Sequence, residues 1–197
     1  LAFLHVLPNF RRELRGVGID KLSVMFDANA EPQLTASGPA QQQLSDAAAI
    51  ADPVTFTTVG TNPPSGLVGD LFIGNTSYLF KKFSFDITNG LMVRNSEYDV
   101  TVASELYRQG RRVISCKLDV FAETAATLYD LAKAGTLAGI FKQTGRTEGN
   151  IVAVALPRVD WKVPETTDGE NEAEWSPTGN ALESADALND EAYLYLF

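Results

Sequence analysis

The sequence predicts a mainly β fold with two packed antiparallel sheets (a sandwich or half-barrel), one flanking α-helix and one long loop. Three observations lead to this fold class. Many short runs alternate between apolar and polar residues, as a half-buried strand requires. Turn dipeptides such as Asn89-Gly90 separate these runs. Only residues 124–134 combine a capping residue, an apolar stripe and a terminating glycine.

The chain is expected to hold one main domain. Its 197 residues, 45% apolar and 21% charged, suit a single sizeable core. Residues 1–16 are expected to be an N-terminal arm or the remnant of a truncated start, because the chain begins with Leu1 rather than Met. The basic run at 11–15 favours the end of a helix or an arm. Residues 17–197 are expected to form the single β domain.

The predicted strands share alternating side chains or flanking turn residues. They are residues 19–26 and 34–38, which form a hairpin, then 71–73, 83–88, 98–103, 114–120, 151–156, 159–163 and 192–197. Residues 151–156 are apolar on both faces, which is typical of a strand covered on both sides. Residues 192–197 are too apolar for a free tail.

Two further segments complete the expected organisation. In the predicted helix at 124–134, Thr124 is the capping residue, Leu128 and Leu131 belong to the apolar stripe, and Gly135 ends the helix. Residues 39–68 are weakly patterned. They predict a long surface loop around one short strand at 54–59, and loops of this length are usually functional or disordered.

The net charge is confined to one end of the chain. The formal charge is −9, from 16 Lys and Arg against 25 Asp and Glu. From Val163 onward there are nine acidic residues and no basic residue, which leaves the first 162 residues neutral. An acidic chain is a poor candidate for binding nucleic acid, because such binding depends on Lys and Arg neutralising phosphates.

The residues indicate no enzyme and no cofactor. Ser-His-Asp and Cys-His catalysis need a histidine base, and the single histidine, His5, lies near the N-terminus. The single cysteine, Cys116, falls on the apolar side of its strand, where cysteine acts as a small hydrophobe. One Cys and one His cannot build a usual zinc site. No phosphate-binding glycine motif occurs, and no pair of carboxylates is singled out for a glycosidase.

The acidic segment at 163–191 leaves several functions open. If the segment is extended, one face carries a patch of carboxylates: Asp168, Glu170, Glu172 and Glu174. Clustered oxygens suit Ca²⁺, although the Asp-x-Asx-x-Asx-Gly loop is absent and a solvated acidic face is the commoner explanation. Trp161 and Trp175 flank the acidic run. Either could stack on carbohydrate, but a tryptophan alternating with Val159 and Val163 more often belongs to a core.

The order of these elements resembles that of the major tail tube proteins of long-tailed bacteriophages. The resemblance covers about residues 17–197. It includes the long loop, the late strand at 150–157 and the end of the chain at 179–197, together with three further passages. The first is the hairpin strand that closes at 34–38. The second is the strand at 83–91, FSFDITNGL, which runs into Asn-Gly as a hairpin. The third is the passage from Gly110 in which a strand is followed directly by a short helix.

The resemblance implies a structural virion protein of the phage tail, made in the host cytoplasm, with no chemistry of its own. Six subunits would form a ring by joining sheets into an inner β-barrel, and rings would stack into a hollow tube that conducts the genome without binding it specifically. Other tail proteins are the expected partners, and no membrane anchor is expected. The long loop, with Thr61, Asn62, Pro63 and Pro64, would contact the next ring.

The resemblance also suggests a role for the acidic segment. Carboxylates on an inner wall would repel DNA phosphates, so part of 163–191 either lines the lumen or faces outward and supplies solubility. Two alternatives to a tail tube protein stay open. One is a relative from a tail tip or a secretion tube. The other is a β-sandwich module that binds carbohydrate or Ca²⁺.

Overall fold

The computed structural model describes residues 3–7, 10–46, 69–94, 98–99, 102–121, 126–163, 166–168, 173–184 and 190–196. These residues group into two compact units. We call the first the hairpin unit (Leu1–Leu22, Ala36–Gly60 and Thr88–Arg112) and the second the sandwich unit (Ser23–Thr35, Thr61–Ile87 and Val113–Phe197). Each unit is described by itself. The predicted division into an arm at 1–16 and one domain at 17–197 stays a prediction.

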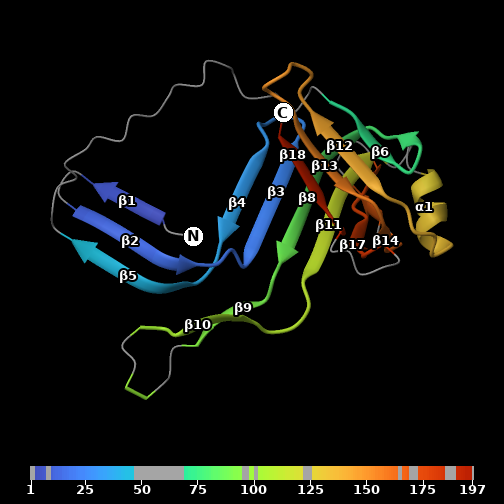
Figure 1. Cartoon of the computed structure of the whole chain (residues 1–197). Coiled ribbons are helices and arrows are strands. Elements are labelled where there is room, and N and C mark those ends of the chain that lie inside the picture. Colours follow the sequence, from blue (N-terminus) through green and yellow to red (C-terminus); the bar gives the residue numbers. More distant parts are fainter. Residues whose placement is uncertain are drawn as a thin grey trace. The chain divides into compact units, whose positions relative to one another are not determined.

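The larger sheet of the sandwich unit has eight strands, and six of them follow the order β14-β17-β11-β8-β3-β4 (Figure 1). Their bounds are Val159–Trp161, Thr178–Ala181, Val113–Phe121, Phe80–Thr88, Lys21–Asp27 and Gln33–Ser37. Two short strands, β15 (Thr166–Asp168) and β16 (Ala173–Trp175), pair with each other, and β16 also pairs with β11. The adjacent β3 and β4 confirm the hairpin predicted from residues 19–26 and 34–38.

The second sheet has five strands in the order β18-β13-β12-β6-β7. Their bounds are Tyr193–Leu196, Val152–Leu156, Ile140–Thr144, Leu71–Ile73 and Thr76–Ser77. The chain turns between β6 and β7 at Gly74, whose φ of 58° suits glycine. The pairing of β18 with β13 is antiparallel, so the apolar end of the chain belongs to a sheet, as predicted. No pattern in the sequence predicted β12.

The core lies between these two sheets. Alternate residues of the larger sheet, including Val24, Phe83 and Leu118, are at most 2% exposed and pack with alternate residues of the smaller sheet, including Val154. The rings of Phe26 and Phe83 stack with their centres 6.0 Å apart. Neither sheet order closes on itself in the residues described. The predicted mainly β fold with two packed antiparallel sheets is confirmed.

The one helix of the described residues, α1 (Ala126–Lys133), confirms the helix predicted at 124–134. Leu128 is fully buried in the core. The helix ends at Gly135, whose φ is 65° and whose backbone nitrogen donates to Ala132 O at 3.1 Å. Thr136 N donates to Leu131 O at 3.0 Å, so these two bonds satisfy carbonyls of the last turn. The predicted cap, Thr124, lies outside the described residues.

The hairpin unit corrects two predictions. An antiparallel sheet joins β1 (Phe3–Leu7), β2 (Phe10–Val17) and β5 (Ala40–Asp46). The basic run at 11–15 is therefore in a strand and not at the end of a helix, and the predicted loop at 39–68 begins with a strand. The strands β2 and β5 carry many polar residues, and their backbone pairing compensates for a weak apolar pattern. The short strand predicted at 54–59 lies outside the described residues.

The second sheet of the hairpin unit is the antiparallel pair of β9 (Leu91–Arg94) and β10 (Glu105–Arg108). It corrects the strand predicted at 98–103, because Tyr98 and Asp99 form a turn, where Asp99 has a φ of 62°. The expected hairpin through Asn89-Gly90 is also wrong, since β8 and β9 belong to different sheets. Asp20 holds this crossover, with its backbone O accepting from Asn89 N at 2.7 Å and its Oδ1 from Leu91 N at 2.6 Å.

Candidate functional site

The outward face of the larger sheet is hollowed into an open polar groove of about 240 Å³. The groove is lined by side chains of three neighbouring strands: Ser23 and Met25 of β3, Lys82, Ser84 and Asp86 of β8, and Lys117 and Asp119 of β11. On β3 and β11 these residues alternate with buried core residues, because successive side chains of a strand point to opposite faces. The alternation of side chains along these strands therefore places apolar residues in the core and polar residues in the groove.

The charges in the polar groove balance. Lys82 and Lys117 face Asp86 and Asp119 in the same hollow. Lys117 Nζ lies 3.7 Å from Asp119 Oδ1, and that oxygen also accepts a hydrogen bond of 2.6 Å from Ser176 Oγ. An exposed pair of this kind contributes about 0–1 kcal/mol. The groove is thus hydrated and carries no net charge, so it offers no strong field to a phosphate.

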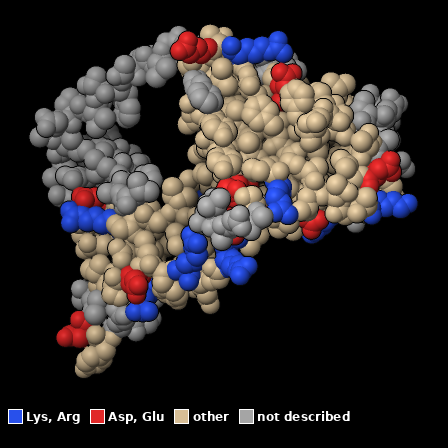
Figure 2. Space-filling model, turned by 45° about the vertical axis from the view of Figure 1, so that its right-hand side comes forward, with Lys and Arg blue, Asp and Glu red and all other residues tan. Residues whose placement is uncertain are grey.

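Figure 2 shows a similar mixture of charges among the described residues on the side that it draws. There the Lys and Arg side chains lie in small groups, several of them beside Asp or Glu. In the part of the chain that the structure describes, no group of three or more His, Cys, Asp and Glu could hold a metal ion.

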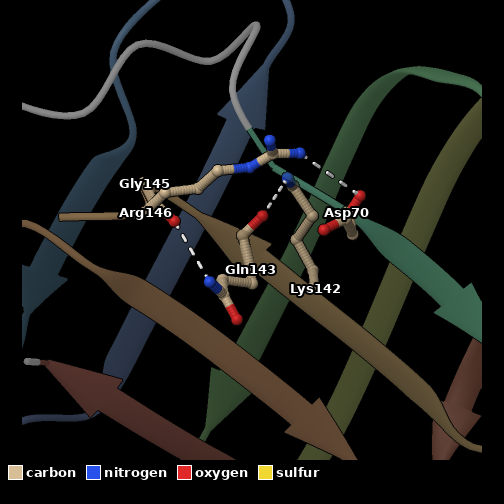
Figure 3. Close-up of polar contacts among 5 residues, drawn as sticks. All are labelled: Asp70, Lys142, Gln143, Gly145 and Arg146. Atoms are coloured by element: carbon tan, nitrogen blue, oxygen red, sulfur yellow. Dashed lines mark hydrogen bonds and ion pairs between the residues drawn. The ribbon is translucent and has the colours of Figure 1, made fainter.

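The most unusual polar group of the sandwich unit is the ammonium of Lys142, which is 1% exposed (Figure 3). Its Nζ donates to Gln143 O at 2.6 Å. It also lies 4.7 Å from the ring centre of Phe80 and 5.8 Å from that of Phe26. Burial lowers the pKa of Lys142 to about 8, and the nearby Asp70 opposes part of that shift. The ammonium is therefore stabilised less well here than in water.

The surroundings of Lys142 indicate a structural role. Asp70 N donates to Gln143 O at 3.1 Å, and Gln143 N donates to Asp70 O at 2.9 Å, so the chain entering β6 is tied to β12. Gln143 Nε2 donates to Gly145 O at 3.1 Å, and Arg146 Nη2 lies 4.0 Å from Asp70 Oδ1 (Figure 3). Only a weak signal of this cluster is present in the sequence: a lysine at a core-facing position between Ile140 and Thr144.

Two residues weighed for chemistry belong to the core. Cys116 is 2% exposed, and burial raises the pKa of its thiol to about 12, so the thiolate needed for nucleophilic attack is disfavoured. Trp161 is 3% exposed and its Nε1 donates to Ala138 O at 3.0 Å, so it packs in the core and is not available to stack on a sugar. His5 lies on β1, opposite Arg12 of β2.

The structure describes the predicted acidic patch only at its ends. Asp168 is on β15 opposite Ala173, and Glu174 is on β16 opposite Thr167 of β15 and Phe121 of β11. The pairing of β16 with β11 ties this part of the acidic segment to the larger sheet. Glu170 and Glu172 lie outside the described residues, as do the loop residues Thr61, Asn62, Pro63 and Pro64. The acidic patch and the inter-ring loop stay predictions.

These observations define a β-sandwich protein whose most prominent surfaces are sheet faces and strand edges. A family model described as phage tail tube protein matches residues 4–186, and the chain belongs to that family. The tail tube family is a structural family of the phage tail, which implies a place in the virion tail. No curated protein matches the chain. Among the described residues, no helix has the length and apolar character to cross a membrane.

Proposed function

We propose that this chain assembles into stacked hexameric rings that form the phage tail tube, the conduit for genome delivery. The observation that carries the proposal is the family match over residues 4–186, which spans almost the whole chain. The tail tube role follows from the family itself. The number of subunits in a ring, the stacking of rings and the passage of DNA are the proposed part.

The edges of the two sheets support assembly. In the described residues β4 ends the larger sheet and β18 ends the smaller one. All five residues of β4 are exposed, with Leu34 at 56%, and neither β4 nor β18 contains a charged residue. Proteins that stay monomeric usually protect such edges with lysine, proline or a covering element. Exposed edge strands without charged residues suit a protein in which the sheets of neighbouring copies pair with each other.

Two surfaces are proposed for contact with the passing genome or the solvent. Part of the acidic segment at 163–191 lines the lumen, where its carboxylates repel phosphate, or it faces outward and supplies solubility. The neutral polar groove is a second surface over which DNA would pass without being retained. Stacked rings bring like charges together, so tubes with an acidic wall form more readily as salt screens the repulsion.

The long loop is proposed for the contact between rings. Residues 39–68 include Thr61, Asn62, Pro63 and Pro64, and β5 within this range belongs to the hairpin unit. If the loop becomes ordered only when rings stack, its ordering costs conformational entropy that the new contacts must offset. Deleting residues 61–64 should then leave single rings but prevent long tubes.

The direct test is negative-stain electron microscopy of the purified chain over a range of concentrations, with the mass measured by light scattering. Rings with a central hole, or stacked tubes, are the expected result. A mass that stays at the 21.3 kDa of one chain at every concentration and salt level would contradict assembly by this chain alone.

A further inference from the structure

We propose that the outward face of the five-stranded sheet is a contact surface for a second copy of this chain. This inference rests on the proposed assembly and names one surface that makes it. We call this surface the aromatic face. Its residues are Phe72 of β6, Phe141 and Gln143 of β12, Ala153 and Ala155 of β13, and Tyr193 and Tyr195 of β18.

The strand register places these residues side by side. Phe141 is opposite Phe72 on one side and Ala155 on the other, and Ala155 is opposite Tyr193. One row of the face therefore crosses four strands, β6, β12, β13 and β18 (Figure 1). The residues that alternate with this row, among them Ile140, are in the core, so the row faces away from it.

The aromatic side chains of this face are substantially exposed. Phe141 is 37% exposed, Tyr193 42% and Tyr195 38%. The two tyrosine rings stack with centres 6.1 Å apart and planes 13° apart, which makes a flat, rigid platform. The alanines of β13 lie between this platform and Phe141, so small side chains separate two aromatic groups. Such a surface offers large contact area at little cost in side-chain entropy.

The pattern of β13 indicates that the aromatic face is covered when the protein works. Val152–Leu156 is apolar on both faces, which is typical of a strand buried on both sides. The core covers the face that carries Val154 and Leu156, while on the outward face Ala153 is 3% exposed and Ala155 is only partly buried. Contiguous exposed apolar surface marks an interaction site more often than chance exposure does. A second molecule would cover the part of this face that the described residues leave exposed.

The charge of the chain favours a second copy of this chain as that molecule. Each copy carries a formal charge of −9, so two copies repel each other wherever their carboxylates approach. The seven residues of the aromatic face include no charged one, and the charged residue beside them is Asp70, which pairs with Gln143 and lies 4.0 Å from Arg146. The opposite outward face, the polar groove, holds four charged side chains. Copies meet at lowest electrostatic cost on the aromatic face.

The outer side of β18 borders this surface. In the described residues β18 is the last strand of its sheet, and its Leu196 is 69% exposed. A copy that packs on the aromatic face can therefore also reach the outer side of β18, where pairing with a strand of that copy would add hydrogen bonds to the apolar contact.

The test compares two glutamate substitutions at outward positions of inner strands. Phe141→Glu puts a carboxylate in the aromatic face, whereas Ser84→Glu puts one in the polar groove. We expect Phe141→Glu to raise the concentration at which light scattering detects assembly by about tenfold or more, and Ser84→Glu to raise it less than twofold. Circular dichroism and the melting temperature show whether each variant folds.

A measurement on the unmodified chain covers the case in which Phe141→Glu does not fold. Hydroxyl-radical footprinting should show Tyr193 and Tyr195 protected severalfold in assembled protein relative to monomer. Equal labelling of these tyrosines in both states, or wild-type assembly by a folded Phe141→Glu variant, would overturn the proposal.

The outcomes separate this inference from the proposed function. Rings that form normally in folded Phe141→Glu would contradict the aromatic contact and leave the tail tube assembly intact. A third outcome is that the wild-type chain forms dimers but never rings, and that Phe141→Glu abolishes the dimers. This outcome would support the contact and contradict the hexameric ring. A chain that stays monomeric at all concentrations would contradict both.

Discussion

The ammonium of Lys142 lies 4.7 Å from the ring centre of Phe80, inside the sandwich unit. The side chain is 1% exposed, and its pKa is lowered to about 8 by burial. A lowered pKa means that the hydrogen bond to Gln143 and the aromatic rings do not fully replace the water that the ammonium has lost. This lysine therefore reduces the stability of the fold at neutral pH.

Replacing Lys142 with methionine should stabilise the protein at pH 7, since methionine keeps the length of the side chain and removes the buried charge. We expect a gain of about 1–3 kcal/mol, by analogy with buried ions replaced by apolar residues. For a chain of this size that corresponds to a rise in melting temperature of roughly 2–4 °C per kcal/mol. Lys117→Met, in the exposed groove, is the matched control and should change the melting temperature little. A lower melting temperature in Lys142→Met would show that the ammonium is stabilising.

The effect of Lys142 should depend on pH in a defined direction. Its pKa is about 8 in the folded state and near the ordinary value of 10.5 in the unfolded state. Between these values the unfolded chain binds more protons, so raising the pH favours the folded state. The destabilisation is complete below pH 8 and disappears above the unfolded pKa. The difference in melting temperature between Lys142→Met and wild type should therefore shrink from pH 7 to pH 10, and a constant difference would refute this assignment.

Gly69 should be far less replaceable than Gly135, although both have a positive φ. A Cβ on Gly69 would lie 2.0 Å from the backbone O of Gln143, whereas a Cβ on Gly135 would meet nothing within 4 Å. Gly135→Ala should cost only the left-handed conformation, about 1–2 kcal/mol. In Gly69→Ala the new Cβ must also displace the backbone of Gln143 in β12, which is hydrogen-bonded to Asp70 at the start of β6. Urea denaturation of both variants measures the difference in the free energy of unfolding. Equal losses in the two variants would mean that the backbone between β12 and β6 shifts at little cost.

The edge of β4 should control assembly without affecting the fold. Leu34 is 56% exposed on this edge strand, so Leu34→Lys adds a charge where sheets of two copies would join. We expect the melting temperature to stay within about 1 °C, because surface substitutions change stability little. The concentration needed for rings should rise about tenfold. Leu79→Lys is the control, since Leu79 is 67% exposed outside the strands. If both variants assemble equally well, β4 is not part of the contact between copies.

Much of the sandwich could be predicted locally. The alternation in residues 114–120 identified both the core side and the polar side of β11, and the polar side later proved to line the groove. Gly135 marked the end of the helix because its backbone conformation is one that other residues rarely adopt. The hairpin of β3 and β4 was predictable because its two strands are neighbours in the chain.

The errors share a different physical cause. The basic run at 11–15 forms β2 because β1 and β5 pair with it through the backbone, and backbone pairing leaves little trace in side-chain type. The Asn89-Gly90 dipeptide suits a hairpin turn, but Asp20, about 70 residues away in the chain, accepts hydrogen bonds from Asn89 N and Leu91 N and guides the chain into another sheet.

The sequence by itself determined which residues of several strands of the sandwich unit face the core, among them β3, β8 and β11, where the helix ends and that the net charge lies near the C-terminus, because these properties depend on neighbouring residues. Only the tertiary structure decided that Lys142 is buried, that β12 lies between β6 and β13, and that Phe72, Phe141, Ala155 and Tyr193 form one row. Those relationships depend on pairing between distant segments, which is selected by the free energy of the whole fold and not by any local pattern.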